Sequence, residues 1–115
     1  YPGAANRVRR HVGPAREKIH TLDEYRNRHA QYRGDEHLKE AHRRFPWVVT
    51  WDDHEFDNNC ANDVSEEKNV ARDVFLARRA RAYQAYYENM PLRRAAAPRG
   101  PHMKLYRQVS YGPLA

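Results

Sequence analysis

Residues 22–33 carry apolar and aromatic side chains every three or four positions, the spacing that places them on one face of an α-helix. Thr21 and Glu24 form an S/T-x-x-E capping box at its start, in which each side chain can accept a hydrogen bond from the other residue's backbone N–H. Gly34 suits the end of the helix, because glycine commonly follows the last helical turn. The pattern therefore predicts a helix over residues 22–33.

Two further stretches have helical periodicity. Asp35 can cap a helix over about residues 36–45, and Pro46 ends it because proline cannot continue a helix. A longer helix is expected from about residue 69 to residue 89, where Pro91 closely follows the last apolar positions. The chain is therefore expected to be rich in helix.

Residues 47–51 are almost continuously apolar and rich in β-branched and aromatic side chains. A strand that is apolar on both faces belongs inside a covered, mostly parallel sheet. A long polar loop is expected over residues 52–68, and residues 104–112 alternate loosely as a half-exposed strand does. The segments 1–20 and 93–103 are basic and broken by proline and glycine, which is typical of irregular structure. Helix, short link, buried strand and polar loop together predict an α/β fold.

The composition fits one small domain, because the chain has 115 residues, of which 40% are hydrophobic and 31% charged. The one cysteine, Cys60, excludes an internal disulfide and a cysteine-rich zinc module. No apolar run approaches the roughly 20 residues of a membrane helix, and no signal peptide is visible. The chain begins with Tyr1, so we expect a trimmed terminus or a piece of a longer protein. The net charge of +6 favours anionic partners, although a solvated arginine-rich helix surface explains it equally well.

Candidate chemistry is concentrated where the apolar run 47–51 passes into the polar loop. Asp52, Asp53, His54 and Glu55 follow one another there. Carboxylate oxygens can hold a cation, and an imidazole with an ordinary pKa near 6.5 can give or take a proton near neutrality. If the backbone bends at this exit, one aspartate can reach a metal while the other caps the loop or orients the imidazole. The alternative is a solvated acidic turn with an accidental histidine.

A cluster of arginines followed by tyrosines in the longest predicted helix offers a rival interpretation. A small basic helical module could bind nucleic acid through these side chains. The tyrosines also have the spacing of a packing stripe, which would leave the arginines on a solvated face. The residues concerned are Arg78, Arg79, Arg81, Tyr83, Tyr86 and Tyr87.

Several motifs occur in an order that resembles the alkaline phosphatase D (PhoD-like) metallophosphatase family. They are Thr21-Leu22-Asp23-Glu24-Tyr25-Arg26, Ala30-Gln31-Tyr32-Arg33, Phe45-Pro46-Trp47-Val48-Val49-Thr50-Trp51-Asp52-Asp53-His54-Glu55, Asp57-Asn58-Asn59, Ala82-Tyr83-Gln84-Ala85-Tyr86-Tyr87-Glu88, Met90-Pro91-Leu92-Arg93 and Leu105-Tyr106-Arg107. The likeness covers the chain from about Arg10 to Ala115. It implies that residues 1–115 are a single partial domain, the central segment of a PhoD-like domain.

The resemblance implies a calcineurin-like metallophosphatase fold, a β-sandwich flanked by helices. It also implies hydrolysis of phosphomonoesters or phosphodiesters by an enzyme that is usually exported, and hence a periplasmic or secreted location. By this comparison Asp53 is a metal ligand and His54 the catalytic acid or transition-state residue, with Asp52 and Asn59 as further metal ligands. The implied cofactors are iron and calcium, and the implied partners are phosphate esters, with nucleic acid only as a substrate. Substrate-binding residues and oligomeric state stay open.

The same resemblance implies that other metal ligands lie outside these residues. One Asp and one His cannot hold a catalytic cluster, because each ion normally takes several protein ligands. We therefore expect the 115-residue chain alone to bind metal weakly and to lack turnover. A third interpretation is a non-catalytic remnant that uses its surface for protein contacts.

Overall fold

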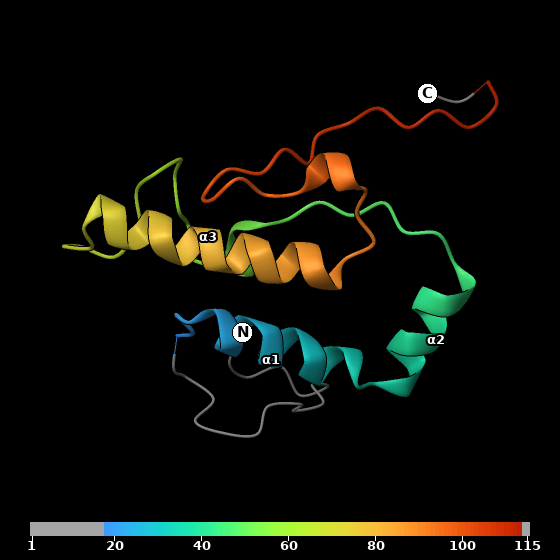
Figure 1. The fold of residues 1–115 in the computed structure, drawn as a ribbon, viewed down its shortest axis with the longest axis horizontal. Helices are drawn as coiled ribbons and strands as arrows, with labels where there is room; N and C mark the ends of the chain where they lie inside the picture. The colour runs from blue at the N-terminus through green and yellow to red at the C-terminus, as the bar shows by residue number, and fades with distance from the viewer. Residues whose placement is uncertain (1–17, 114–115) are drawn as a thin grey trace.

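The computed structural model describes residues 18–113 and is built from helices joined by extended segments (Figure 1). Three α-helices, α1 (Leu22–Arg33), α2 (Glu36–Arg44) and α3 (Arg72–Asn89), are accompanied by two 3₁₀ turns, η1 (Asp53–Glu55) and η2 (Arg94–Ala96). The predicted helices are confirmed, with α2 ending one residue earlier and α3 beginning a few residues later than expected.

The helix starts form as the sequence predicts. The backbone N–H of Glu24 donates to Thr21 Oγ1 at 3.2 Å, and the backbone N–H of Thr21 donates to Glu24 Oε2 at 2.8 Å, so both halves of the capping box are present. The Asp35 side chain accepts from the backbone N–H of Leu38 at 2.8 Å and caps α2. Gly34 has right-handed backbone angles, so it is not needed for a left-handed turn. Glycine suits this position because an added Cβ would lie only 3.2 Å from the carbonyl oxygen of Gln31.

The two predicted strands are wrong for the residues that the structure describes. Residues 47–51 are extended but pair with no neighbouring strand, and Val48 is 72% exposed. Residues 104–112 likewise form no strand. A strand needs a partner for its backbone N–H and C=O groups, and within residues 18–113 only isolated bridges such as Ala61–Val64 and Arg99–His102 occur.

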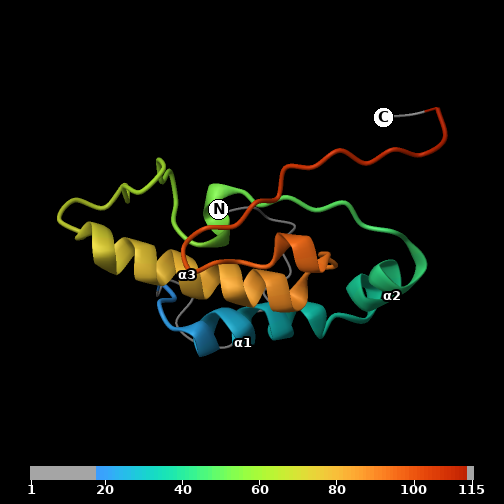
Figure 2. The same ribbon diagram turned by 45° about the horizontal axis from the view of Figure 1, so that its top comes forward.

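Helices α1 and α3 lie side by side and run in the same direction, as Figures 1 and 2 show from two angles. Their contact surface is aromatic, and it buries Tyr25 of α1 against Phe75, Ala82 and Tyr83 of α3. Arg26 of α1 adds a two-point ion pair with Glu88 of α3, with N–O distances of 2.7 Å. This pair of helices is the support on which the loop after residue 51 rests.

The extended segment 47–51 is fixed to α3 by side chains. The Trp51 ring stacks on Tyr83, with centroids 3.9 Å apart, and the Tyr86 hydroxyl donates to the Thr50 carbonyl oxygen at 2.8 Å. Beyond η1, Phe56 is buried against Phe75 and Tyr83, and its carbonyl oxygen accepts from the Tyr25 hydroxyl at 3.2 Å. Aromatic anchors therefore hold the chain on both sides of residues 52–55.

Candidate metal and catalytic site

The polar residues after Trp51 form a tight turn rather than a continuing strand. Asp52 has extended backbone angles and caps η1, because its Oδ1 accepts from the backbone N–H of Asp53 at 2.7 Å. The backbone then turns through η1 and returns to the core at Phe56. Alternation along a strand would have sent Asp52 and Asp53 to opposite faces, and the turn removes that constraint.

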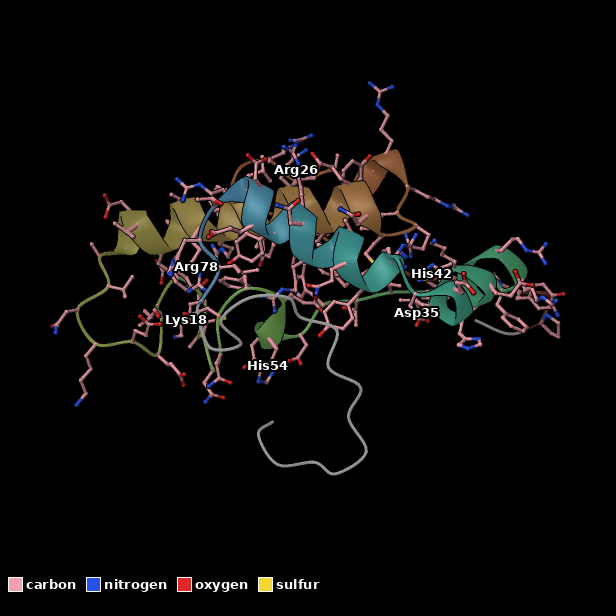
Figure 3. All side chains as sticks on the ribbon, turned by 90° about the horizontal axis from the view of Figure 1, so that it is seen from below. Lys18, Arg26, Asp35, His42, His54 and Arg78 are labelled. Atoms are coloured by element: carbon pink, nitrogen blue, oxygen red, sulfur yellow. The ribbon has the colours of Figure 1, made fainter. Side chains whose placement is uncertain are left out.

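Asp52, Asp53 and His54 converge, with one possible ligand atom from each lying within 4.8 Å of the others. His54 Nδ1 lies 3.1 Å from Asp52 Oδ2 and 2.9 Å from Asp53 Oδ1. The side chains are 68% (Asp52), 24% (Asp53) and 50% (His54) exposed, so the group is open to solvent. Figure 3 shows His54 on the η1 turn.

The carboxylates change the protonation behaviour of the group. The hydrogen bond that the His54 ring N–H donates to Asp52, aided by the charges of Asp53 and Asp52, raises the pKa of His54 above its ordinary value. The pKa of Asp53 is lowered by a side-chain hydrogen bond with Asp52, by the backbone N–H of Asn59 and by the charge of His54. At neutral pH, Asp53 is therefore anionic, as a cation ligand must be.

Asn59 reaches this group through its backbone. Its N–H donates to Asp53 Oδ2 at 2.5 Å, and it has a left-handed φ of 48°, which asparagine tolerates better than most residues. Its side-chain amide nitrogen instead donates to Glu66 at 2.9 Å, and that of Asn58 donates to the same carboxylate at 2.7 Å. Sequence reasoning missed Glu66, because nothing in the pattern of the 52–68 loop distinguishes it.

Sequence reasoning also missed a buried ion pair beneath the turn. Asp57 is 3% exposed and accepts from Arg78 Nη1 at 2.9 Å, while Arg78 Nε lies within hydrogen-bonding distance of the Tyr25 hydroxyl (3.0 Å) and the Ile19 carbonyl oxygen (3.1 Å). Ser65 donates to the same aspartate at 2.6 Å. The Arg78 guanidinium thus links α3 to the 52–68 loop and to the residue stretch that precedes α1. It does not lie open at the surface.

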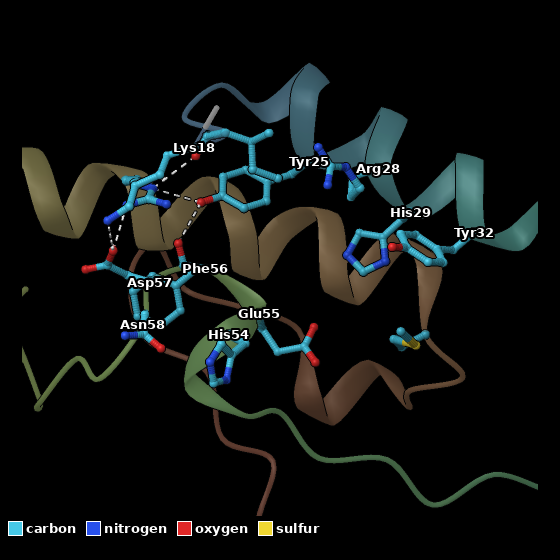
Figure 4. Close-up of a pocket in the computed structure, with 13 residues that line it drawn as sticks. Lys18, Tyr25, Arg28, His29, Tyr32, His54, Glu55, Phe56, Asp57 and Asn58 are labelled. Atoms are coloured by element: carbon cyan, nitrogen blue, oxygen red, sulfur yellow. Dashed lines mark hydrogen bonds and ion pairs between the residues drawn. The ribbon is translucent and has the colours of Figure 1, made fainter. Parts of the chain in front are cut away.

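A cavity of about 470 Å³ adjoins the turn and separates it from α1 (Figure 4). His54 and Glu55 line it from η1, and His29 and Tyr32 line it from α1. Burial raises the pKa of the Glu55 carboxyl, with a further rise from the charge of Asp52. The candidate histidine therefore borders a space large enough for a small molecule.

The arginines and tyrosines of the nucleic-acid interpretation mostly face inwards. Arg79 and Tyr83 are each 8% exposed and Tyr86 is 3% exposed. Arg81 is exposed and donates to the His20 carbonyl oxygen at 3.2 Å. A docking surface for nucleic acid needs its cations and rings at the surface. The packing-stripe interpretation of the tyrosines is confirmed for Tyr83 and Tyr86, and the nucleic-acid module is disfavoured.

The donor set fits part of a cation site. Carboxylate oxygens and imidazole nitrogen suit hard or borderline cations, including calcium and iron, which the family resemblance implies. Calcium takes about 6–8 oxygen ligands, and iron also takes more donors than three side chains supply. Asp52, Asp53 and His54 thus fit such ions as a partial ligand set.

No helix within residues 18–113 is both long and apolar enough to cross a bilayer.

Comparisons with known proteins establish the family of this chain. The family model "PhoD-like phosphatase" matches residues 1–115. Alkaline phosphatase D of Bacillus subtilis (strain 168) is 61% identical over 98 residues, which are 85% of this chain and 17% of that protein. A solved structure described as "Structure of PhoD" matches 82% of this chain and 18% of its own, with a TM-score of 0.77 and 62% identity. The chain spans less than a fifth of either relative's length, and it belongs to the PhoD-like phosphatase family.

Proposed function

We propose that the protein containing these residues is a metal-dependent phosphatase that hydrolyses phosphomonoesters or phosphodiesters. The observation that carries the proposal is the convergence of Asp52, Asp53 and His54 beside a cavity, in a chain of this family. The similarity to alkaline phosphatase D supports the same chemistry. The β-sandwich architecture, the iron and calcium cofactors, and a periplasmic or secreted location are parts of this proposal.

Each residue has a distinct role in the proposed site. Asp53 supplies a metal ligand, with Asp52 and Asn59 as further ligands or supports. A bound cation would supply the positive charge that makes a phosphoryl group more electrophilic. His54, held at Nδ1 by the two aspartates, meets the leaving-group oxygen through Nε2, where it donates a proton or a hydrogen bond. The Asn59 N–H keeps the Asp53 carboxylate anionic and oriented.

The test compares Asp53→Asn with Asp23→Asn in the full-length protein. Asp23 lies in the first turn of α1, where its side chain is 86% exposed, so it is a matched carboxylate outside the site. We expect Asp53→Asn to lose metal, measured by elemental analysis, and to lose hydrolysis of a nitrophenyl phosphate. Asp23→Asn should retain both.

The same experiment separates the enzyme from a non-catalytic remnant. Full-length protein that contains no metal as purified, and hydrolyses no phosphate ester when metals are added, would favour the remnant. Full activity in Asp53→Asn would remove this aspartate from the site.

A further inference from the structure

A second cavity, of about 540 Å³, lies between α3, the 52–68 loop and the segment that returns along α3 after η2. The course of that returning segment beside α3 can be followed in Figure 2. Arg79, Arg99, His102 and Lys104 all line this cavity, and no described residue that lines it is acidic. The cations Arg79, Arg99 and Lys104 repel one another across this space, so this arrangement favours an anion between them.

Arg79 supplies the second observation. The residue is 8% exposed, and its Nε is buried without a hydrogen-bond partner among the described residues. Its Nη1 donates to the Asn62 carbonyl oxygen, and the guanidinium carbon lies 5.7 Å from the Phe75 ring centroid and 5.9 Å from that of Tyr83. The two rings and the Asn62 carbonyl keep the guanidinium in place.

A buried guanidinium without a carboxylate partner is costly. Charged groups inside proteins are normally paired, because they lose hydration that only an opposite charge and hydrogen bonds replace. Asp63, the residue after Asn62, is bound to Arg72 and interacts with Arg79 only as a neighbouring charge. Among the described residues, the Arg79 guanidinium therefore has no carboxylate hydrogen-bonded to it.

We propose that this cavity binds a phosphate-type oxyanion, with Arg79 at its base and Lys104, Arg99 and His102 at its exposed rim. Guanidinium groups bind phosphate oxygens through paired N–H donors, and lysine adds a point charge. This site is separate from Asp52, Asp53 and His54, none of which lines the cavity. The inference does not depend on hydrolysis, although inorganic phosphate would be a product of the proposed reaction.

The test measures binding of inorganic phosphate to the full-length protein after its metals have been removed by a chelator. We expect one phosphate per protein, with affinity reduced about tenfold or more by Arg79→Met, because this variant lacks the charged N–H donors of the guanidinium. Arg81→Met is the matched control, because Arg81 lies on the same helix with its side chain at the surface and outside the cavity. It should bind phosphate within about twofold of the unaltered protein, because Arg81 does not line the cavity and solvent screens its charge.

Lys104→Ala covers the possibility that Arg79→Met fails to fold, because Lys104 is exposed and its removal should leave the fold intact. We expect this variant also to bind phosphate more weakly. Asp53→Asn should bind it unchanged, which distinguishes this site from the proposed metal site. Absence of phosphate binding in the chelated protein, or unaltered affinity in both cavity variants, would overturn the proposal.

Discussion

At the scale of single residues, the site depends on the pairing of His54 with two aspartates. Both carboxylates approach the same ring nitrogen, Nδ1, at 3.1 Å and 2.9 Å. This contact sets the orientation of the ring and raises its pKa. A histidine held in this way can act as an acid without a deep pocket around it.

Replacing His54 with alanine should reduce kcat for phosphate-ester hydrolysis by the full-length protein by roughly 10²–10⁴, the usual contribution of general acid–base catalysis. Stability should change little, because the side chain is 50% exposed. His37→Ala, an exposed histidine on α2, is the control and should leave kcat unaltered. Equal activity in the two variants would exclude His54 from the mechanism.

At the scale of elements, α3 organises the site through one buried stripe. Tyr83 and Tyr86 hold the incoming chain through Trp51 and Thr50, while Arg78 holds the outgoing chain through Asp57. A helix face, rather than a sheet, therefore supports the turn that carries the candidate site. The position of η1 depends on these side-chain contacts.

Tyr86→Phe should lower the free energy of unfolding by about 0.5–1.5 kcal/mol, because it removes the hydroxyl that donates to the Thr50 carbonyl oxygen while keeping the buried ring. Chemical denaturation would measure the change. Tyr87→Phe, at the neighbouring and less buried tyrosine, is the control. A larger loss for Tyr87→Phe than for Tyr86→Phe would contradict this account of the anchor.

The contact between α1 and α3 should weaken in acid. The hydrogen bond from Arg26, with a second from Gln84, lowers the pKa of Glu88 from its ordinary 4.5 to about 2. A carboxylate with a depressed folded-state pKa stabilises the fold above its unfolded-state pKa, and that contribution is lost as pH falls from about 4.5 to about 2.

Glu88→Gln should therefore lower stability at neutral pH and flatten its decline in this acid range. Glu36→Gln, an exposed carboxylate of the first turn of α2, should leave the decline unaltered. Thermal unfolding followed from pH 7 downwards would measure both. The effect is expected to be about 1 kcal/mol or less, because the Arg26–Glu88 pair is partly exposed.

At the scale of the whole molecule, several large apolar side chains of the described residues lie at the surface. Val48, Tyr106 and Tyr111 are 72%, 79% and 83% exposed. Soluble proteins rarely leave large contiguous apolar patches open to water. We expect the remaining polypeptide of the full-length protein to cover these side chains and to supply the missing metal ligands.

The isolated 115-residue chain should therefore show no hydrolysis of nitrophenyl phosphate above a chelated sample, whereas the full-length protein should be active and lose activity on chelation. Two carboxylates from one turn are too few to hold a catalytic cation firmly. Turnover by the isolated chain that disappears in Asp53→Asn would contradict this expectation.

Much of the local structure was predictable, and the candidate site only partly. The helices, the Thr21 box and the Asp35 cap depend on residues within a turn of one another, and the periodicity shows them. The acidic group was recognisable from its position after an apolar run. Glu66 and the buried Asp57–Arg78 pair were not, because contacts between distant residues leave no local signal.

The sequence by itself determined where α1 and α2 begin and which segment carries two aspartates and a histidine, because backbone hydrogen bonds and caps are made by near neighbours. The tertiary structure decided that residues 47–51 lie unpaired along α3 and that Arg79 faces inwards. It also decided that Asp52, Asp53 and His54 converge. Strand pairing and burial require partners far along the chain, and only the packed arrangement brings those partners together.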